Sequence, residues 1–285
     1  MNIFEQMLSR YTVQTREQQI NATHEVMQEI ALAGLYRSGF FDKAAFYGGT
    51  CLRIFHNLPR FSEDLDFSLI AKNETFDLEH YFPAIVEEFK AAGRDVVIVR
   101  KDKKTETTIE SAFLKDNTTM YDIQFQTEKN IKIKIEVDTD PPLGFSTEQK
   151  LSLMPFSFMT RCFSLPDLYA GKMHALLFRN WKTRVKGRDW FDFEWYVRHN
   201  VPLNFEHLQI RTKEFNGSDM SKEAFVELLK ERFTSTNIDL VKRDILPFIQ
   251  TPKDIEIWSN DYFLQLAERI VYLTDHQMFL RRGFR

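Results

Sequence analysis

The spacing of apolar residues predicts a helix at the start of the chain and a series of strands after it. Between Ile20 and Gly34, apolar and small side chains recur at helical intervals, and the pattern ends near Gly39. A second helix is predicted over 76–92. The segments that follow, DVVIVR, TTIESAFLK (107–115), MYDIQFQ and IKIKIEVD, have strand-like patterns. Their short connections favour a largely antiparallel or mixed sheet.

From Pro155 onward the pattern is mostly helical, and it ends in a long run predicted as helix over 255–278. We therefore predict an α+β protein with two lobes. Residues 1–155 would form a lobe with a mixed sheet and helices, and residues 156–285 a mostly α-helical lobe that completes the active site.

A glycine turn and a pair of aspartates lie close together in the segment FYGGTCLRIFHNLPRFSEDLDFSL, residues 46–69. Asp64 and Asp66 belong to a run that alternates like a strand, so both carboxylates face the same way, about 7 Å apart. Such a pair is stabilised by a cation. Gly48 and Gly49 permit a sharp turn with exposed N–H groups before a helix, which favours phosphate oxygens. Since Gly49 and Asp64 are fifteen positions apart, the helix must fold back to bring the turn to the acids.

The segment 131–138 offers a third carboxylate. Its isoleucines and Val137 alternate with Lys132, Lys134, Glu136 and Asp138, so one face is apolar and the other polar. If this strand lies beside the strand of Asp64, either Glu136 or Asp138 would join a metal site. An ordinary half-exposed sheet face is the alternative interpretation.

In the second half of the chain, charged residues recur in two predicted helices. Lys172 and Arg179 are seven positions apart and share a helix face, from which they could clamp a triphosphate. Asp189 and Asp192 share a face of the next helix, where Asp189 could instead cap the helix start. A buried Asp192 would need a cationic partner, and Lys172 and Arg188 are the candidates.

A basic segment precedes that helix. Lys182, Arg184, Lys186 and Arg188 alternate through WKTRVKGRD. We predict that this segment contacts an RNA backbone, with an ordinary solvated loop as the alternative.

Composition excludes several classes of protein. The 285 residues carry a formal net charge of −3 and lack both a membrane-length apolar run and a signal-peptide pattern, so we expect a soluble, cytoplasmic protein. Cys51 and Cys162 are too few for a disulfide framework, and Cys51 is predicted to be a small buried residue.

Taken in order, the motifs GGTCLR, PRFSEDLDF, KIKIEVD, DLYAGKMHALLFR and RVKGRDWFDF resemble those of the AbiEii-type nucleotidyltransferase toxins, a group that includes the MenT toxins. The resemblance covers roughly residues 45–195. It implies an NTP substrate, Mg²⁺, a nucleotide transferred to an RNA acceptor, which is tRNA in the MenT members, and a cognate antitoxin. It also implies roles for Ser62, Asp64 and Asp66 at the nucleotide and metal, for Lys172 at the phosphates, and for Asp189 or Asp192 as a late acidic residue.

Together these interpretations predict an enzyme that moves a nucleotide from an NTP to an RNA 3′ end, with the 3′ end of tRNA as the expected acceptor. Two alternatives are a transferase that modifies a protein hydroxyl with AMP or another nucleotide, and a degenerate module that binds nucleotide without turnover. The predicted catalytic residues are Asp64, Asp66, Lys172, Asp189 and Asp192; the nucleotide-binding residues are Gly48, Gly49, Thr50, Arg53, Ser62, Arg179 and Arg188; the metal ligands are Asp64, Asp66 and Glu136; and the RNA-binding residues are Lys182, Arg184 and Lys186.

Overall fold

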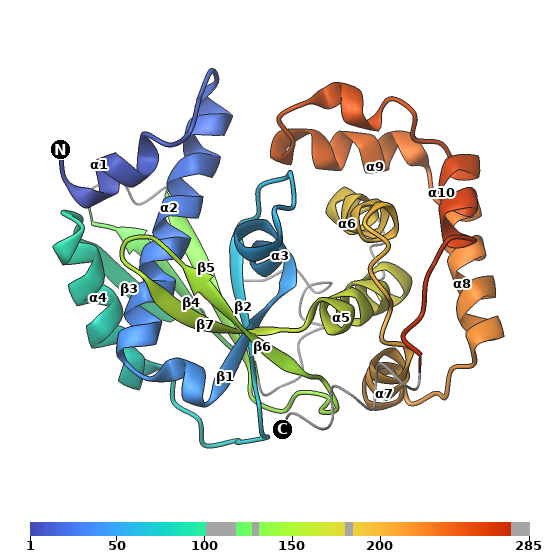
Figure 1. The fold of residues 1–285 in the computed structure, drawn as a ribbon, viewed down its shortest axis with the longest axis horizontal. Helices are drawn as coiled ribbons and strands as arrows, with labels where there is room; N and C mark the ends of the chain where they lie inside the picture. Colours follow the sequence, from blue (N-terminus) through green and yellow to red (C-terminus); the bar gives the residue numbers. More distant parts are fainter. Residues whose placement is uncertain (101–117, 127–130, 180–184, 275–285) are drawn as a thin grey trace. The chain divides into compact units, whose positions relative to one another are not determined.

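A mixed sheet with helices and a separate group of helices make up the computed structural model, which describes residues 1–100, 118–126, 131–179 and 185–274 (Figure 1). The chain divides into two units. Unit 1 contains Met1–Pro141 and Thr147–Cys162, and unit 2 contains Pro142–Ser146 and Phe163–Arg285. The sheet belongs to unit 1 and unit 2 is helical, which confirms the predicted α+β class. The strand predicted at 107–115 lies outside the described residues.

The sheet is seven-stranded, with the order β3-β4-β5-β2-β1-β7-β6. Strand β2 lies near its centre, antiparallel to β1 and parallel to β5. On β5, Ile133, Ile135 and Val137 are buried, as the alternation predicted. The strands are β1 (Ala44–Tyr47), β2 (Asp64–Leu69), β3 (Val96–Arg100), β4 (Thr118–Phe125), β5 (Lys132–Asp138), β6 (Thr147–Ser152) and β7 (Phe158–Phe163).

Unit 1 contains four α-helices within residues 1–100, 118–126, 131–141 and 147–162. The long helix α2 begins after Thr15, whose hydroxyl accepts a hydrogen bond from the Gln18 N–H. It lies against α4, and the two come so close that a Cβ on Gly34 would be 2.6 Å from the Ile85 Cα. The helices are α1 (Ile3–Leu8), α2 (Arg16–Arg37), α3 (Gly48–His56) and α4 (Phe82–Ala91), with 3-10 turns at Phe40–Asp42 and Glu79–Tyr81.

The helix predicted over 76–92 is shorter than expected, because α4 begins only at Phe82. Asp77 accepts the Glu79 N–H and so favours a turn before the helix. Pro83 then occupies the first turn of α4, where a missing N–H costs nothing.

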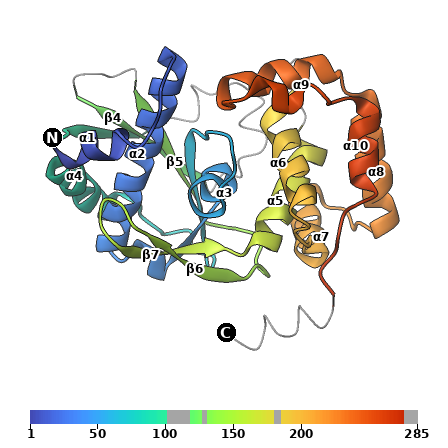
Figure 2. The same ribbon diagram turned by 45° about the horizontal axis from the view of Figure 1, so that its top comes forward.

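In the described part of unit 2, six α-helices surround a core of aromatic side chains. Trp190 and Phe193 of α6 both contact Phe233 of α8 and Phe263 of α10. Helices α8 and α10 lie side by side (Figure 2). Among the helices in the described residues, none has the length and apolar character needed to cross a membrane. The helices are α5 (Leu165–Phe178), α6 (Gly187–Arg198), α7 (Phe205–Asn216), α8 (Lys222–Ser235), α9 (Ile238–Ile245) and α10 (Asn260–Ala267), with 3-10 turns at Leu246–Phe248 and Pro252–Ile255.

The prediction of one long helix over 255–278 is wrong for the residues of this range that the structure describes. Only α10 is α-helical there, and it starts after Ser259, whose side chain caps the Tyr262 N–H. Beyond α10 the backbone pairs with another segment. The Leu203 N–H donates to the Val271 carbonyl over 2.7 Å, and the Leu203 carbonyl accepts from the Leu273 N–H over 3.0 Å. These hydrogen bonds replace those of a helix. Residues 275–278 lie outside the described part.

Candidate active site

The glycine turn of unit 1 lies directly against the Asp-x-Asp pair. Strand β1 runs antiparallel to β2 with Tyr47 opposite Asp66, so the chain folds back as the spacing required. Gly48 has φ +82°, and a Cβ on it would be 2.4 Å from Asp66 Oδ2. Glycine is needed here both for the left-handed backbone and for room beside the carboxylate.

A buried arginine lies close to the second glycine of the turn. A Cβ on Gly49 would be 2.7 Å from Arg60 Nη2 and 2.9 Å from Ser62 Oγ. Arg60 is only 2% exposed, and its Nη1 donates to the Phe61 carbonyl over 2.9 Å. The guanidinium and the Ser62 hydroxyl therefore lie beside the turn that was predicted to bind phosphate. Arg60 belongs to the motif PRFSEDLDF, but nothing in its spacing showed that it would return to the glycines.

The side chains of Thr50 and Arg53, which are predicted to bind nucleotide, make contacts that hold α3 in place. Thr50 is fully buried, and its hydroxyl donates to the Asp64 carbonyl. Arg53 donates from Nε to Glu25 over 2.8 Å and from Nη1 to the Leu58 carbonyl over 3.0 Å. Nucleotide binding by these two residues stays a prediction.

Carboxylates from two neighbouring strands face the same way. Asp64 and Asp66 are half-buried at alternate positions of β2. Strand β5 runs parallel beside it, with Glu136 opposite Asp66 and Asp138 opposite Ser68. Asp138 also accepts the Asp140 N–H over 3.1 Å. Of the two candidates for a third carboxylate, Glu136 is thus the one next to the aspartate pair.

Lys134 lies among these acids, and sequence reasoning placed it only on the polar face of its strand. Its Nζ is 2.5 Å from Glu136 Oε1 and 3.8 Å from Asp64 Oδ2. Burial opposes its charge, but Asp64 and Glu136 outweigh burial and raise the pKa of Lys134 above its usual value.

The donor set suits a hard cation with few protein ligands. Within the described residues, no three His, Cys, Asp or Glu side chains gather closely enough to hold a metal ion. Asp64 and Asp66 nevertheless provide oxygen ligands on one face of β2. Mg²⁺ is commonly bound by one or two carboxylates together with substrate phosphates, so the residues present fit this ion.

His24 of α2 is a further polar group beside the acids. Both ring nitrogens are buried and have no hydrogen-bond partner among the described residues. Burial lowers the pKa of His24, and the nearby carboxylates of Glu63 and Asp64 only partly oppose it. The helical pattern around His24 did not indicate that its side chain would lie beside these acids.

In unit 2, Lys172 joins the two aspartates of α6. Its Nζ is 2.8 Å from Asp189 Oδ1 and 2.8 Å from Asp192 Oδ2, which confirms Lys172 as a partner for the buried Asp192. Arg179 Nη1 contacts Asp189 Oδ2 at 3.1 Å. Arg179 lies just beyond the end of α5 with an extended backbone, so it reaches the same aspartate as Lys172 from outside the helix. Burial alone would raise the pKa of Asp189, but Lys172, Arg179 and Lys186 hold it well below its usual range.

The start of α6 is capped by another acid than Asp189. The N-cap residue, Lys186, makes no side-chain hydrogen bond to the helix. The Gly187 N–H donates instead to Asp244 Oδ2 over 2.8 Å. Asp189 contacts Lys172 and Arg179 instead. The capping interpretation of Asp189 is therefore wrong.

The described part of the predicted basic segment is not an exposed patch. Arg188 is buried at 8% exposure, with its guanidinium 4.2 Å from the centre of the Phe248 ring. Lys186 is half-buried, and burial together with Arg179 and Arg188 lowers its pKa to about 7. Both findings weaken the predicted RNA contact at these two residues. Lys182 and Arg184 lie outside the described residues.

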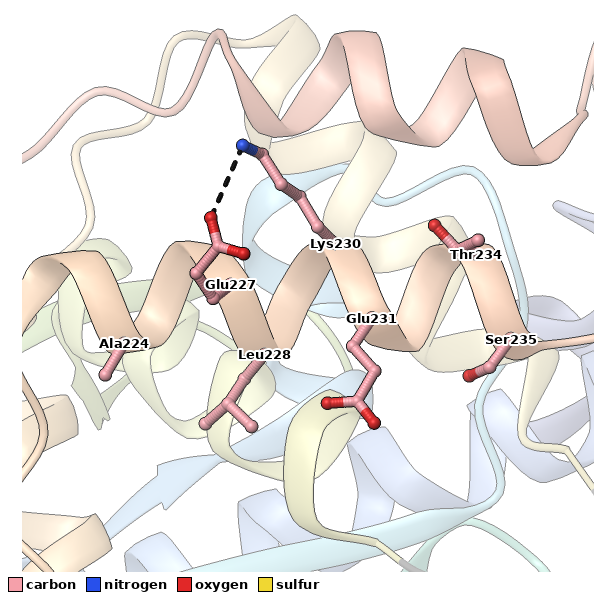
Figure 3. Close-up of a pocket in the computed structure, with 7 residues that line it drawn as sticks. All are labelled: Ala224, Glu227, Leu228, Lys230, Glu231, Thr234 and Ser235. Atoms are coloured by element: carbon pink, nitrogen blue, oxygen red, sulfur yellow. Dashed lines mark ion pairs between the residues drawn. The ribbon is translucent and has the colours of Figure 1, made fainter.

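A surface hollow along α8 does not make a second candidate (Figure 3). All the residues that line it come from this one helix, and its ion pair joins Glu227 to Lys230 at 3.6 Å. Polar groups from different elements do not converge there, as they do in a ligand site.

The fold and the site define the class of protein. A mixed sheet that carries two aspartates beside a glycine turn is the arrangement expected of a nucleotidyltransferase. The chain belongs to the family described as "Nucleotidyl transferase AbiEii toxin, Type IV TA system", whose model matches residues 30–279. The predicted family is thus confirmed, and the protein is a nucleotidyltransferase of the type IV toxin group. A comparison with curated protein sequences gave no significant match.

The solved structures that match this chain include one from Mycobacterium tuberculosis and two from Helicobacter pylori. MenT4, a nucleotidyltransferase toxin from Mycobacterium tuberculosis H37Rv, matches with a TM-score of 0.59 and 14% identity over 97% of this chain and 91% of that chain. A putative nucleotidyltransferase from H. pylori gives a TM-score of 0.43 and 18% identity over 92% and 96% of the two chains. JHP933 from Helicobacter pylori gives 0.46 and 18% over 93% and 92%. At such identities, the match to MenT4 supports the fold.

Proposed function

We propose that this protein is a Mg²⁺-dependent nucleotidyltransferase that transfers a nucleotide from an NTP to an RNA acceptor, the 3′ end of tRNA. The observation that carries the proposal is the close approach of the glycine turn to the acid pair. The Asp66 carboxylate lies so near Gly48 that a side chain on this residue would collide with it. A turn with free N–H groups attracts phosphate oxygens, and adjacent carboxylates attract the cation that accompanies them. Both requirements of an NTP are met in one place.

In the proposed reaction, the acceptor hydroxyl attacks the α-phosphorus, a phosphodiester bond forms and pyrophosphate leaves. Asp64 and Asp66 would hold Mg²⁺, which when bound neutralises phosphate charge and stabilises the leaving group. The Gly48–Gly49 turn and the Ser62 hydroxyl would orient the phosphates, with the Arg60 guanidinium beside the turn adding positive charge. In this scheme, positioning and electrostatics supply most of the rate enhancement.

For unit 2, we propose that Lys172 binds the triphosphate and that Asp189 and Asp192 position it. An ammonium group has three N–H donors, and the two aspartates are both 2.8 Å from Nζ. These contacts fix the lysine's rotamer, so less side-chain entropy is lost when a phosphate binds. Asp189 and Asp192 are then positioning residues rather than catalytic ones.

The acceptor and the partner protein follow from the family. An RNA acceptor is proposed because the sequence motifs resemble those of the MenT group, and a cognate antitoxin because the family is described as part of type IV toxin–antitoxin systems. We place the protein in the cytoplasm on the same basis.

The proposal is tested by incubating the purified protein with Mg²⁺, total tRNA and each labelled NTP in turn. Asp66→Asn keeps the size of the side chain but removes the charge, so we expect the RNA label to fall at least 100-fold while the melting temperature changes little. Asp219→Asn is the matched control, because Asp219 is 85% exposed and is expected to leave transfer unchanged.

Each outcome bears on a different part of the proposal. RNA label that depends on Asp66 and on one NTP supports the transferase and identifies its nucleotide. Transfer by Asp66→Asn at the wild-type rate would refute the metal site. Label in protein added from a lysate, with none in RNA, would replace the RNA acceptor with a protein acceptor.

A further inference from the structure

We infer that the Lys134 ammonium takes the place of one divalent cation in the carboxylate cluster, so that the nucleotide-free enzyme offers a site for a single metal ion formed by Asp64 and Asp66. Glu136 serves as the partner of Lys134 and not as a metal ligand. The inference rests on the proposed function, because it concerns the same metal site.

The contacts of Lys134 are those of a bridging cation. The residue lies opposite Asp64 in the parallel pairing of β5 with β2, on the same side of the sheet as Glu136. Its Nζ is 2.5 Å from Glu136 Oε1 and 3.8 Å from Asp64 Oδ2. The Lys134 side chain is 19% exposed and that of Glu136 is 16% exposed, so water screens the contact only in part.

The charges of this cluster also point to one metal ion. Asp64, Asp66 and Glu136 carry three negative charges on neighbouring positions of two strands. Lys134 balances one of them, which leaves a formal charge of −2 on these four groups. One divalent ion balances that charge, whereas a second would leave the cluster positive until the phosphates arrive.

The pairing further decides which oxygens remain for a metal. Glu136 Oε1 is already held at hydrogen-bond distance by an ammonium, and replacing this contact requires Lys134 to move away. Asp64 is only at 3.8 Å from the same ammonium, outside hydrogen-bond distance, so it keeps its oxygens for a metal. Lys134 also places a positive charge where a second metal ion would approach Glu136, so we expect Glu136 to become a metal ligand when that charge is removed.

The test measures Mn²⁺ binding to the nucleotide-free protein by electron paramagnetic resonance, with Mn²⁺ as the probe for Mg²⁺. Lys134→Met removes the charge and keeps most of the side-chain volume. We expect this variant to bind Mn²⁺ at least tenfold more tightly than wild type, or to bind a second ion. Glu136→Gln removes a charge but no ligand, so it should weaken Mn²⁺ binding far less than Asp66→Asn does, and the Lys134→Met/Glu136→Gln double variant should return to near the wild-type affinity.

Lys132→Met is the matched control. Lys132 lies two positions earlier on the same face of β5, but its Nζ pairs with Asp122 at 3.0 Å. Loss of this positive charge should change Mn²⁺ affinity less than twofold. A tenfold gain in this variant would show that general charge, rather than the position of Lys134, controls metal binding, and would overturn the inference.

A thermal measurement keeps the test valid if Lys134→Met folds less stably. A metal ion that occupies the vacated position stabilises the folded state by mass action. Millimolar Mg²⁺ should therefore raise the melting temperature of Lys134→Met by more than that of wild type. Equal shifts in the two proteins would refute the inference.

The remaining outcomes separate the inference from the proposed function. If Glu136→Gln weakens Mn²⁺ binding of the wild type as much as Asp66→Asn does, Glu136 is a ligand and the inference fails, while the metal site stands. If neither wild type nor any variant binds Mn²⁺ at millimolar concentration, with or without an NTP, the metal site itself is refuted and the inference with it.

Discussion

Replacement of Gly48 by alanine tests the geometry that carries the functional proposal. The added Cβ would be 2.4 Å from Asp66 Oδ2 and 3.2 Å from both Asp66 Cβ and Cγ. To reach an ordinary contact of 3.4 Å, the carboxylate oxygen must move by about 1 Å. The aspartate has only two side-chain torsions, and strand pairing with β1 and β5 fixes its backbone, so the movement rotates the carboxylate away from its position beside the turn.

Two costs follow, and they have different readouts. The left-handed backbone at φ +82° costs an alanine about 1–2 kcal/mol of folding free energy. A displacement of about 1 Å at the reacting centre can reduce the rate about 100-fold. We therefore expect Gly48→Ala to lower the free energy of unfolding by about 2 kcal/mol and to reduce transfer at least 100-fold.

Gly217→Ala separates these two costs. Gly217, at the end of α7, also has a left-handed backbone, with φ +69°, but a Cβ there would meet no atom within 4 Å. This variant should lose about 1 kcal/mol in urea unfolding and keep wild-type transfer. If Gly48→Ala retained wild-type transfer while showing the expected loss of stability, Asp66 would not need its position beside the turn, and the argument would be refuted.

Three further predictions concern unit 2. Lys172→Met should lower the free energy of unfolding by about 3 kcal/mol in urea, because two buried aspartates lose a cation; Lys213→Met, which removes an exposed partner, should cost less than 1 kcal/mol, and equal losses would contradict the reasoning. The folded-state pKa of Asp189 lies below the unfolded value of about 3.9, so its contribution to stability is present above about pH 5 and is lost as the pH falls toward the folded pKa. Urea unfolding should thus show Asp189→Asn less stable than wild type at pH 7 and the gap narrower at pH 3, whereas a gap of constant size would refute the pKa argument. Gly171→Ala, inside α5 with no atom within 4 Å of the new Cβ, should raise stability by about 0.5–1 kcal/mol, and a lower melting temperature would contradict this expectation.

Periodicity in the sequence was enough to assign the acids to the correct faces of their elements, but it did not identify the side chains beside them. Asp64 and Asp66 were assigned to one face of a strand from alternation alone, and Asp192 was expected to need a cationic partner if it was buried. Lys134 was assigned to the correct face as well, but alternation does not say which side chains of the next strand lie beside it. That information came from the parallel register with β2.

Residues that the fold brings back from a distance were the hardest to predict. Arg60 lies eleven positions after Gly49 in the sequence, yet its guanidinium would contact a Cβ placed there. Thr50 is a second case: its place in the glycine motif suggested phosphate binding, and nothing in that motif indicated that its hydroxyl bonds to the Asp64 carbonyl. In both cases the deciding contact depends on how α3 folds back onto β2, which local patterns do not encode.

The two charged clusters differ in the balance of their charges, and this difference fits the roles proposed for them. In unit 1, Lys134 faces three carboxylates, so the cluster keeps a negative charge that a divalent cation can balance. In unit 2, Lys172 and Arg179 contact Asp189 and Asp192, and Lys186 also acts on Asp189, so this cluster keeps no excess negative charge. A balanced, buried cluster holds its lysine in one position and has no excess charge with which to attract a metal ion. We therefore expect Mn²⁺ to bind at Asp64 and Asp66 and not at Asp189 and Asp192, so that Asp192→Asn should leave Mn²⁺ affinity unchanged while Asp66→Asn abolishes it; loss of binding in both variants would refute this division of roles.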